Sequence, residues 1–161
     1  MHVSSRHHLR SDEVREFETA LADLGAEADA DSYELVELEG TPFDLVLVDG
    51  DPLACYVGNG DREPFITVRG ANALDPARRL VTVDAGAVSF VSDGADVMRP
   101  GIVEADDAIE EGDLVVVVEE SHGKALAIGR ALVDGTEMLG DQGRVVESLH
   151  HVGDDLYEFE V

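Results

Sequence analysis

The chain has 161 residues, of which 36 are acidic and 11 basic, and its formal net charge is −25 with His neutral. This length fits one domain or two small ones and excludes a large multidomain enzyme. Hydrophobic residues make up 44% of the chain, enough for a real core, so wholesale disorder is excluded as well.

Three further features bear on where the protein works. No apolar run approaches the roughly 18–20 residues of a membrane helix. The polar, basic start MHVSSRHHLR lacks the apolar core of a signal peptide. Cys55 is the single cysteine, so no internal disulfide can form. We therefore expect a soluble cytoplasmic protein.

The acidic residues are spread over the whole chain. Residues 1–80 hold 17 acidic and 7 basic residues, and residues 81–161 hold 19 and 4, with Lys124 the only lysine. This pattern suggests a halophilic protein, and an acidic mesophilic protein that binds cations or basic partners is the alternative. At ordinary salt this net charge would argue against nucleic acid as a ligand. At about 1 M salt the Debye length is ~3 Å, so the net charge does not exclude RNA binding under that condition.

The first section predicts a small α+β unit. Val14, Phe17, Leu21 and Leu24 recur at helical spacing, with Ser11 as a candidate N-cap and Gly25 just after the helix. The pattern then alternates and predicts strands, a loop over 58–63 and, after a short apolar piece at 65–68, a short helix within 71–79. The expected strands cover residues 35–38, 43–48 and 53–57, with an Asp-Gly turn over 49–52.

The second section predicts a small, mainly β barrel. Asp84 ends an apolar strand and is expected to cap a helical turn that reaches Val91. Short glycine-rich turns separate the remaining apolar pieces. The expected strands cover residues 81–84, 114–119, 124–133, 143–152 and 156–161, with a short strand between the breaks in 94–103. We place the boundary near residues 75–80, which gives domains at 1–78 and 79–161.

The sequence offers little support for catalysis, a metal or a cofactor. Cys55 lies within an apolar strand, which favours a buried, inert thiol. The adjacent histidines 7–8 and 150–151 point to opposite faces of a strand, which disfavours chelation. No phosphate-binding loop is present. The carboxylate pairs at 106–107, 119–120 and 154–155 are interpreted as solvated turns, so we expect neither an enzyme nor a cofactor.

The segment from Val83 to Val103, VDAGAVSFVSDGADVMRPGIV, strongly resembles the opening of a PUA domain, named for pseudouridine synthases and archaeosine transglycosylases. The later strands continue the resemblance, which covers residues 79–161. It implies a pseudo-barrel of about six strands that binds structured RNA. Together with the first section, the expected fold is an α+β N-terminal domain followed by a mainly β PUA pseudo-barrel.

The resemblance also implies where RNA would lie. In similar domains RNA contacts the first helix, the following strand and the glycine-containing loop. Small residues there let a sugar-phosphate backbone approach closely, and Arg99 is expected to reach a phosphate or a base edge. The positions carried onto this chain are Gly86, Ala87, Ser89, Phe90, Gly94, Ala95, Asp96, Val97, Met98, Arg99, Pro100 and Gly101.

Basic residues are rare in the second section, which makes each one a candidate contact. Lys124 and Arg130 are therefore added to the RNA-binding set. For Lys124 an ion pair with Glu119 or Glu120 across the hairpin is an equal alternative.

The first section, with His7-His8-Leu9-Arg10 and Leu45 to Gly50, resembles the domain before PUA in archaeal relatives of the malignant T-cell-amplified-sequence translation factors. Those eukaryotic proteins pair with density-regulated protein on the small ribosomal subunit. The expected function is thus non-catalytic binding of tRNA or small-subunit rRNA in translation initiation or recycling, with the ribosome or a translation factor as partner. The alternatives are an accessory part of an RNA-modifying enzyme of pseudouridine synthase or archaeosine transglycosylase type, and a purely protein-binding module.

Overall fold

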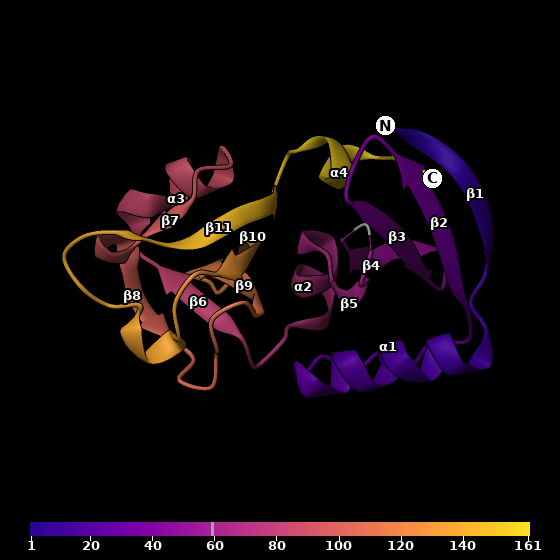
Figure 1. Cartoon of the computed structure of the whole chain (residues 1–161), viewed down its shortest axis with the longest axis horizontal. Coiled ribbons are helices and arrows are strands. Elements are labelled where there is room, and N and C mark those ends of the chain that lie inside the picture. The colour runs from indigo at the N-terminus through magenta and orange to yellow at the C-terminus, as the bar shows by residue number, and fades with distance from the viewer. Residues whose placement is uncertain (59) are drawn as a thin grey trace. The chain divides into compact units, whose positions relative to one another are not determined.

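The computed structural model describes residues 1–58 and 60–161, which form two compact units, Met1–Pro76 and Ala77–Val161 (Figure 1). The predicted loop over 58–63 includes residue 59, which lies outside the described residues. No helix in the described ranges is long and apolar enough to span a membrane.

The first unit is built on a five-stranded antiparallel sheet in the order β1-β2-β3-β4-β5. Its strands are β1 (His2–His8), β2 (Tyr33–Glu39), β3 (Phe43–Val48), β4 (Asp51–Val57) and β5 (Glu63–Ile66), and its helices are α1 (Ser11–Asp23) and α2 (Val68–Leu74). Strand β1 was not predicted, because this edge strand is almost wholly exposed and buries no apolar face. Backbone pairing with β2 holds it in the sheet, together with exposed side-chain bonds from Ser4 to Glu37 O and from Arg6 to Glu34.

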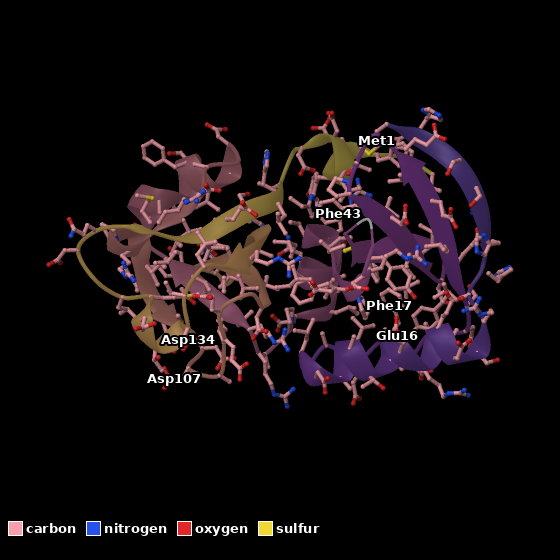
Figure 2. The ribbon with its side chains drawn as sticks, in the orientation of Figure 1. Met1, Glu16, Phe17, Phe43, Asp107 and Asp134 are labelled. Atoms are coloured by element: carbon pink, nitrogen blue, oxygen red, sulfur yellow. The ribbon has the colours of Figure 1, made fainter. Side chains whose placement is uncertain are left out.

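Helix α1 packs on this sheet through its apolar face. Phe17 is buried and meets Tyr56 of β4 edge to face, with ring centroids 4.8 Å apart. Figure 2 shows Phe17 on the side of α1 that faces the strands. The predicted N-cap is wrong by one residue. Arg10 is the N-cap, since its backbone N–H donates to Glu13 Oε1 at 3.0 Å and Ser11 is already helical. The predicted ending is confirmed, because Gly25 has φ 69° and its N–H donates to Ala22 O.

The turn between β3 and β4 is confirmed as Asp-Gly type, since Asp49 and Gly50 have φ of 50° and 89°. Helix α2 begins at Val68, earlier than expected. Thr67 sets this start, because its hydroxyl oxygen accepts the Gly70 N–H at 3.0 Å. Position 70 must be glycine because a Cβ there would lie 1.8 Å from Leu53 O.

The second unit is a six-stranded, nearly closed barrel-like sheet in the order β7-β11-β10-β9-β6-β8, which confirms the predicted mainly β barrel. Among the described strands of this sheet, only β6 and β9 pair in parallel. The strands are β6 (Leu80–Val83), β7 (Val97–Met98), β8 (Ile102–Ala105), β9 (Leu114–Glu119), β10 (Ala125–Ala131) and β11 (Arg144–His151). The helical pieces are α3 (Ala85–Ser92), η1 (Arg99–Gly101), η2 (Gly135–Glu137) and α4 (Asp155–Glu158).

The barrel core consists mostly of aliphatic side chains from β6, β8, β9, β10 and β11, joined by Ile109 and Met138 from the loops. Residues 114–118 of β9 are all buried, as their continuous apolar run predicted. One strand prediction fails. Residues 156–161 do not pair with β11, since the chain turns into α4 and then continues without regular structure.

Asp154 causes this turn, and it is not the solvated residue that the sequence suggested. Its carboxylate accepts the backbone N–H groups of Tyr157 at 2.8 Å and His151 at 2.9 Å, and so caps α4. The same carboxylate lies 2.9 and 3.0 Å from Nδ1 of His150, a side chain that is only 1% exposed. Burial raises the pKa of Asp154, but the bonds from His150, His151 and Tyr157 outweigh burial and lower the pKa below its usual value.

We expect Asp154→Ala to lower the free energy of unfolding by about 1–3 kcal/mol, since both the α4 cap and the His150 partner are lost. Asp154→Asn should cost less, because asparagine also caps helices. Urea denaturation at fixed KCl measures both changes.

The lowered pKa makes the Asp154 contribution depend on pH. It is present above the unfolded-state pKa of about 3.9 and is lost as pH falls through the lower folded-state pKa. The stability gap between parent and Asp154→Asn should therefore shrink under acid. A gap that stays constant down to acid unfolding would contradict this assignment.

Candidate nucleic-acid interface

One end of the barrel carries an open groove of about 360 Å³ between α3, β7 and η1. Figure 1 shows α3 beside β7 at this end of the second unit. Most of the lining residues are small or apolar. They are Asp84, Gly86, Ala87, Phe90, Val91, Ala95, Asp96, Val97, Met98, Pro100 and Gly101.

Asp84 joins the two sides of the groove. Its carboxylate accepts the Ala87 N–H at 3.0 Å and caps α3, as the sequence predicted. Its backbone N–H donates to Gly101 O at 2.9 Å, which ties the start of α3 to the end of η1. A Cβ on Gly101 would lie 2.9 Å from the Ala87 Cβ. Glycine at this position therefore lets the two segments come into contact.

The loop after α3 is held on β11. Asp96 accepts the Ser148 backbone N–H at 2.8 Å and pairs with Arg144 Nη1 at 2.8 Å. Burial raises the pKa of Asp96, but the bonds from Arg144 and Ser148 outweigh burial and hold the pKa below its usual value. The His151 ring covers Gly94, where a Cβ would lie 2.8 Å from Nε2, and the φ of 94° also favours glycine.

Two large apolar side chains remain exposed at the groove. Phe90 on α3 is 66% exposed, and Met98 on β7 is 48% exposed. Neighbouring Val91 and Val97 are buried in the barrel core. An aromatic ring left in solvent beside an apolar groove offers a stacking surface for a planar ligand.

Most of the residues carried over from the resemblance meet at this groove. Those that line it are Gly86, Ala87, Phe90, Ala95, Asp96, Val97, Met98, Pro100 and Gly101. Ser89, Gly94, Arg99, Lys124 and Arg130 are not among its lining residues. Val91 and Asp84 also line the groove; Val91 was not among the expected site residues, and Asp84 was expected only as a helix cap. Val91 could have been included from its place in the predicted helical turn, directly after Phe90.

Arg99 turns away from the groove and holds the loop between β10 and β11. Its Nε donates to Glu137 O at 2.9 Å and its Nη1 to Gln142 O at 3.1 Å, while its backbone N–H donates to Gly143 O at 2.9 Å. The side chain lies against Gly140 and Gly143, where any Cβ would meet it at 2.8–3.0 Å. In this structure Arg99 therefore clamps a loop.

The other cations of the barrel differ in what they contact. Arg130 Nη1 donates to Gly112 O at 2.9 Å, and Arg144 pairs with Asp96. Lys124 uses its backbone N–H to bond Glu119 Oε1 at 3.0 Å. Among residues 1–58 and 60–161, no carboxylate forms an ion pair with its ammonium, so the alternative of a pair with Glu119 or Glu120 is not seen there.

We expect Arg99→Ala to lower the free energy of unfolding by about 1–2 kcal/mol, because two carbonyls lose a charged donor. Amide hydrogen exchange in residues 138–143 should become faster. Lys124→Ala is the matched control, since the removed cation is exposed and its stability should change by no more than about 0.5 kcal/mol. Equal stability and exchange in the two variants would show that Arg99 does not hold this loop.

Comparison with known proteins agrees with this architecture. Residues 79–153 match the family model of the PUA domain. The chain is 42% identical over 118 residues to an uncharacterised protein of Methanocaldococcus jannaschii, covering 73% of this chain and 71% of that protein. It is 39% identical over 136 residues to Translation machinery-associated protein 20 of Saccharomyces cerevisiae, covering 80% and 72%.

A crystal structure of a hypothetical protein from Pyrococcus horikoshii matches 96% of this chain and 98% of its own, with a TM-score of 0.84 and 33% identity. The similarity therefore extends over both units. The resemblance drawn from residues 83–103 is confirmed, and the chain belongs to the family of PUA-domain proteins that includes Translation machinery-associated protein 20.

Proposed function

We propose that this chain is a non-catalytic RNA-binding protein of the translation machinery. Its PUA domain binds structured RNA, either tRNA or small-subunit rRNA, at the groove between α3, β7 and η1. Membership of a family that includes Translation machinery-associated protein 20 supports the link to translation. The presence of a PUA domain supports RNA as the ligand.

One observation carries the assignment of the surface. Nine of the residues that the resemblance implied line a single groove, and Phe90 stands exposed beside it. Gly86, Ala87 and Gly101 keep the groove free of bulk, which allows close approach of a nucleotide. An exposed aromatic ring is the usual platform for a splayed base.

The proposed step is initiation or recycling on the small ribosomal subunit. The resemblance of the first unit to the domain before PUA in relatives of the malignant T-cell-amplified-sequence factors supports this step. The first unit would then dock the ribosome or a translation-factor protein, and the protein would work in the cytoplasm.

The chemistry of the described groove residues supports binding over catalysis. Both carboxylates there already hold structural bonds, Asp84 to the start of α3 and Asp96 to Arg144 and Ser148. Cys55 lies in the first unit, fully buried, and burial raises the pKa of its thiol, so the thiolate needed for attack is disfavoured.

We expect Phe90→Ala to weaken binding of the purified chain to bulk tRNA or to small ribosomal subunits by about 1–3 kcal/mol, because a stacking ring is lost. Filter binding and co-sedimentation at molar KCl measure the two ligands. Leu139→Ala is the matched control, since Leu139 is 55% exposed and does not line the groove. Parent-like affinity of Phe90→Ala, with an unchanged circular dichroism spectrum, would refute the assigned surface.

A second experiment addresses catalysis. After incubation of the purified chain with bulk tRNA, nucleoside mass spectrometry should show no new modified base. Turnover of any nucleoside by the chain alone would replace the binding-protein proposal with an RNA-modifying enzyme.

A further inference from the structure

We infer that the outer edge of β1 is a docking surface for an acidic protein segment, which binds as an extended strand and continues the sheet of the first unit. This inference deepens the proposed docking role of the first unit and rests on it. It names the surface that docks and the chemistry of the partner, and it does not involve the groove of the barrel.

The outer edge of β1 is open. Figure 1 shows β1 as the outermost strand of the first sheet, and among residues 1–58 and 60–161 only β2 pairs with it. Its residues are exposed except Ser5, which is partly buried. After a bulge between Val3 and Ser5, the pairing is regular up to His8. An edge of this kind presents backbone N–H and C=O groups that another strand can bond.

The opposite edge of the same sheet is protected. Strand β5 has only four residues, which include Glu63 and Pro64. Proline has no backbone N–H to offer a neighbouring strand, and a short, charged edge deters pairing. Strand β1 has seven residues and no proline. Of the two edges, β1 is therefore the one that can accept a strand.

The charge of the chain is reversed at β1. Residues 1–11 hold two arginines, three histidines and no acidic residue, whereas residues 12–161 hold 36 acidic and 9 basic residues. The side chains of Arg6 and Arg10 are 48% and 75% exposed. Complementary charge steers a partner to a surface and disfavours wrong partners. The cations of β1 thus favour an acidic partner.

Strand β2 shows which kind of strand β1 accepts. Its sequence YELVELE carries three glutamates, and it runs antiparallel to β1. Arg6 Nε bonds Glu34, and His2 Nε2 lies 2.6 Å from Glu39 Oε2. In the described part of the chain, no other group bonds the Arg6 guanidinium, so its Nη atoms keep N–H donors for a carboxylate on the outer side.

A peptide suits this edge better than RNA does. RNA gains most of its affinity from phosphate contacts with basic side chains, and here Arg6 already has Glu34 while Arg10 has Asp12 and Glu13. RNA also lacks the row of N–H and C=O groups that a strand edge bonds.

The glutamates of β2 do not prevent docking of an acidic strand. A docked strand would lie two strand spacings from β2, which is about 10 Å. At about 1 M salt the Debye length is ~3 Å, so repulsion over this separation is screened.

The test uses the full chain and a fluorescein-labelled, end-capped peptide with the β2 sequence YELVELE. Fluorescence anisotropy gives the affinity over a KCl series in which circular dichroism shows an unchanged fold. We expect saturable binding that weakens about threefold or more when glutamine replaces each glutamate of the peptide, because cross-strand charge pairs are lost. Arg6→Gln should weaken binding of the parent peptide about twofold or more. Arg15→Gln, which changes an exposed arginine of α1, is the matched control and should keep the parent affinity.

Two N-methylated peptides test strand pairing itself. One carries methyl groups on the backbone nitrogens of alternate residues starting at Glu34, and the other on those starting at Leu35. Successive residues of a strand direct their N–H groups to opposite edges, so each peptide lacks the donors of one edge. One of the two should bind about tenfold or more weakly, and the other should bind like the parent peptide.

Several results would overturn this inference. They are the absence of saturable binding, equal affinity for the glutamine peptide, and the same affinity for both methylated peptides. Displacement of the peptide by bulk tRNA would instead place RNA at β1. A dimer of the chain alone in light scattering, with slowed amide exchange in residues 5–8, would place a second copy there. Either of these two results would also refute an acidic protein segment as the partner.

The proposed function is tested separately. Binding of bulk tRNA without binding of the peptide would overturn the role of β1 and leave the proposed RNA binding in place. Failure of bulk tRNA and small ribosomal subunits to bind at any salt would overturn the proposed function, and the peptide result would still decide the role of β1.

Discussion

The two sides of the groove depend on Asp84. Its backbone N–H holds the end of η1 through Gly101 O, and its carboxylate fixes the first turn of α3. Together the two bonds join the segments that bring Ala87 of α3 close to Gly101 of η1. The same carboxylate also sets the local charge, because it supplies a negative group at the helix end where a ligand anion would otherwise bind.

Three arginines of the barrel, Arg99, Arg130 and Arg144, bond other groups of the protein in this strongly acidic chain. Arg99 and Arg130 donate to backbone carbonyls, and Arg144 bonds Asp96. A guanidinium has five N–H donors in a fixed plane, so it can join a loop to a strand where a lysine offers only a point charge. Salt screening weakens short hydrogen bonds of this kind less than it weakens the attraction between separated surface charges.

The net charge of −25 describes the whole chain and does not describe the groove. Taken over the whole chain, it is a composition that predicts a surface suited to high salt. At the groove, the carboxylates are fixed in structural bonds and the remaining surface is apolar and aromatic. Recognition by stacking and shape needs no basic patch, so acidity and RNA binding are compatible in one small protein.

The sequence by itself determined the elements whose local signals are strong. Strand β9 follows from five consecutive buried aliphatic residues, the β3–β4 turn from Asp49-Gly50, and the start of α3 from Asp84. The resemblance carried by residues 83–103 indicated the PUA domain and implied most of the groove lining. Each of these signals lies within a few neighbouring residues, which is the range over which a linear pattern carries information.

Only the tertiary structure decided the features that depend on distant partners. Strand β1 exists because β2 offers it backbone partners, although its side chains bury nothing. Residues 155–158 are helical because Asp154 caps them while bonding the buried His150, which overrides their alternating pattern. Arg99 faces carbonyls some 40 residues away, at Glu137 and Gln142, because glycines at 140 and 143 leave room for it. The residues next to a cation in the sequence do not show whether its side chain already bonds a distant group. Only the tertiary structure therefore distinguishes a cation that is available to contact RNA from one that holds a loop.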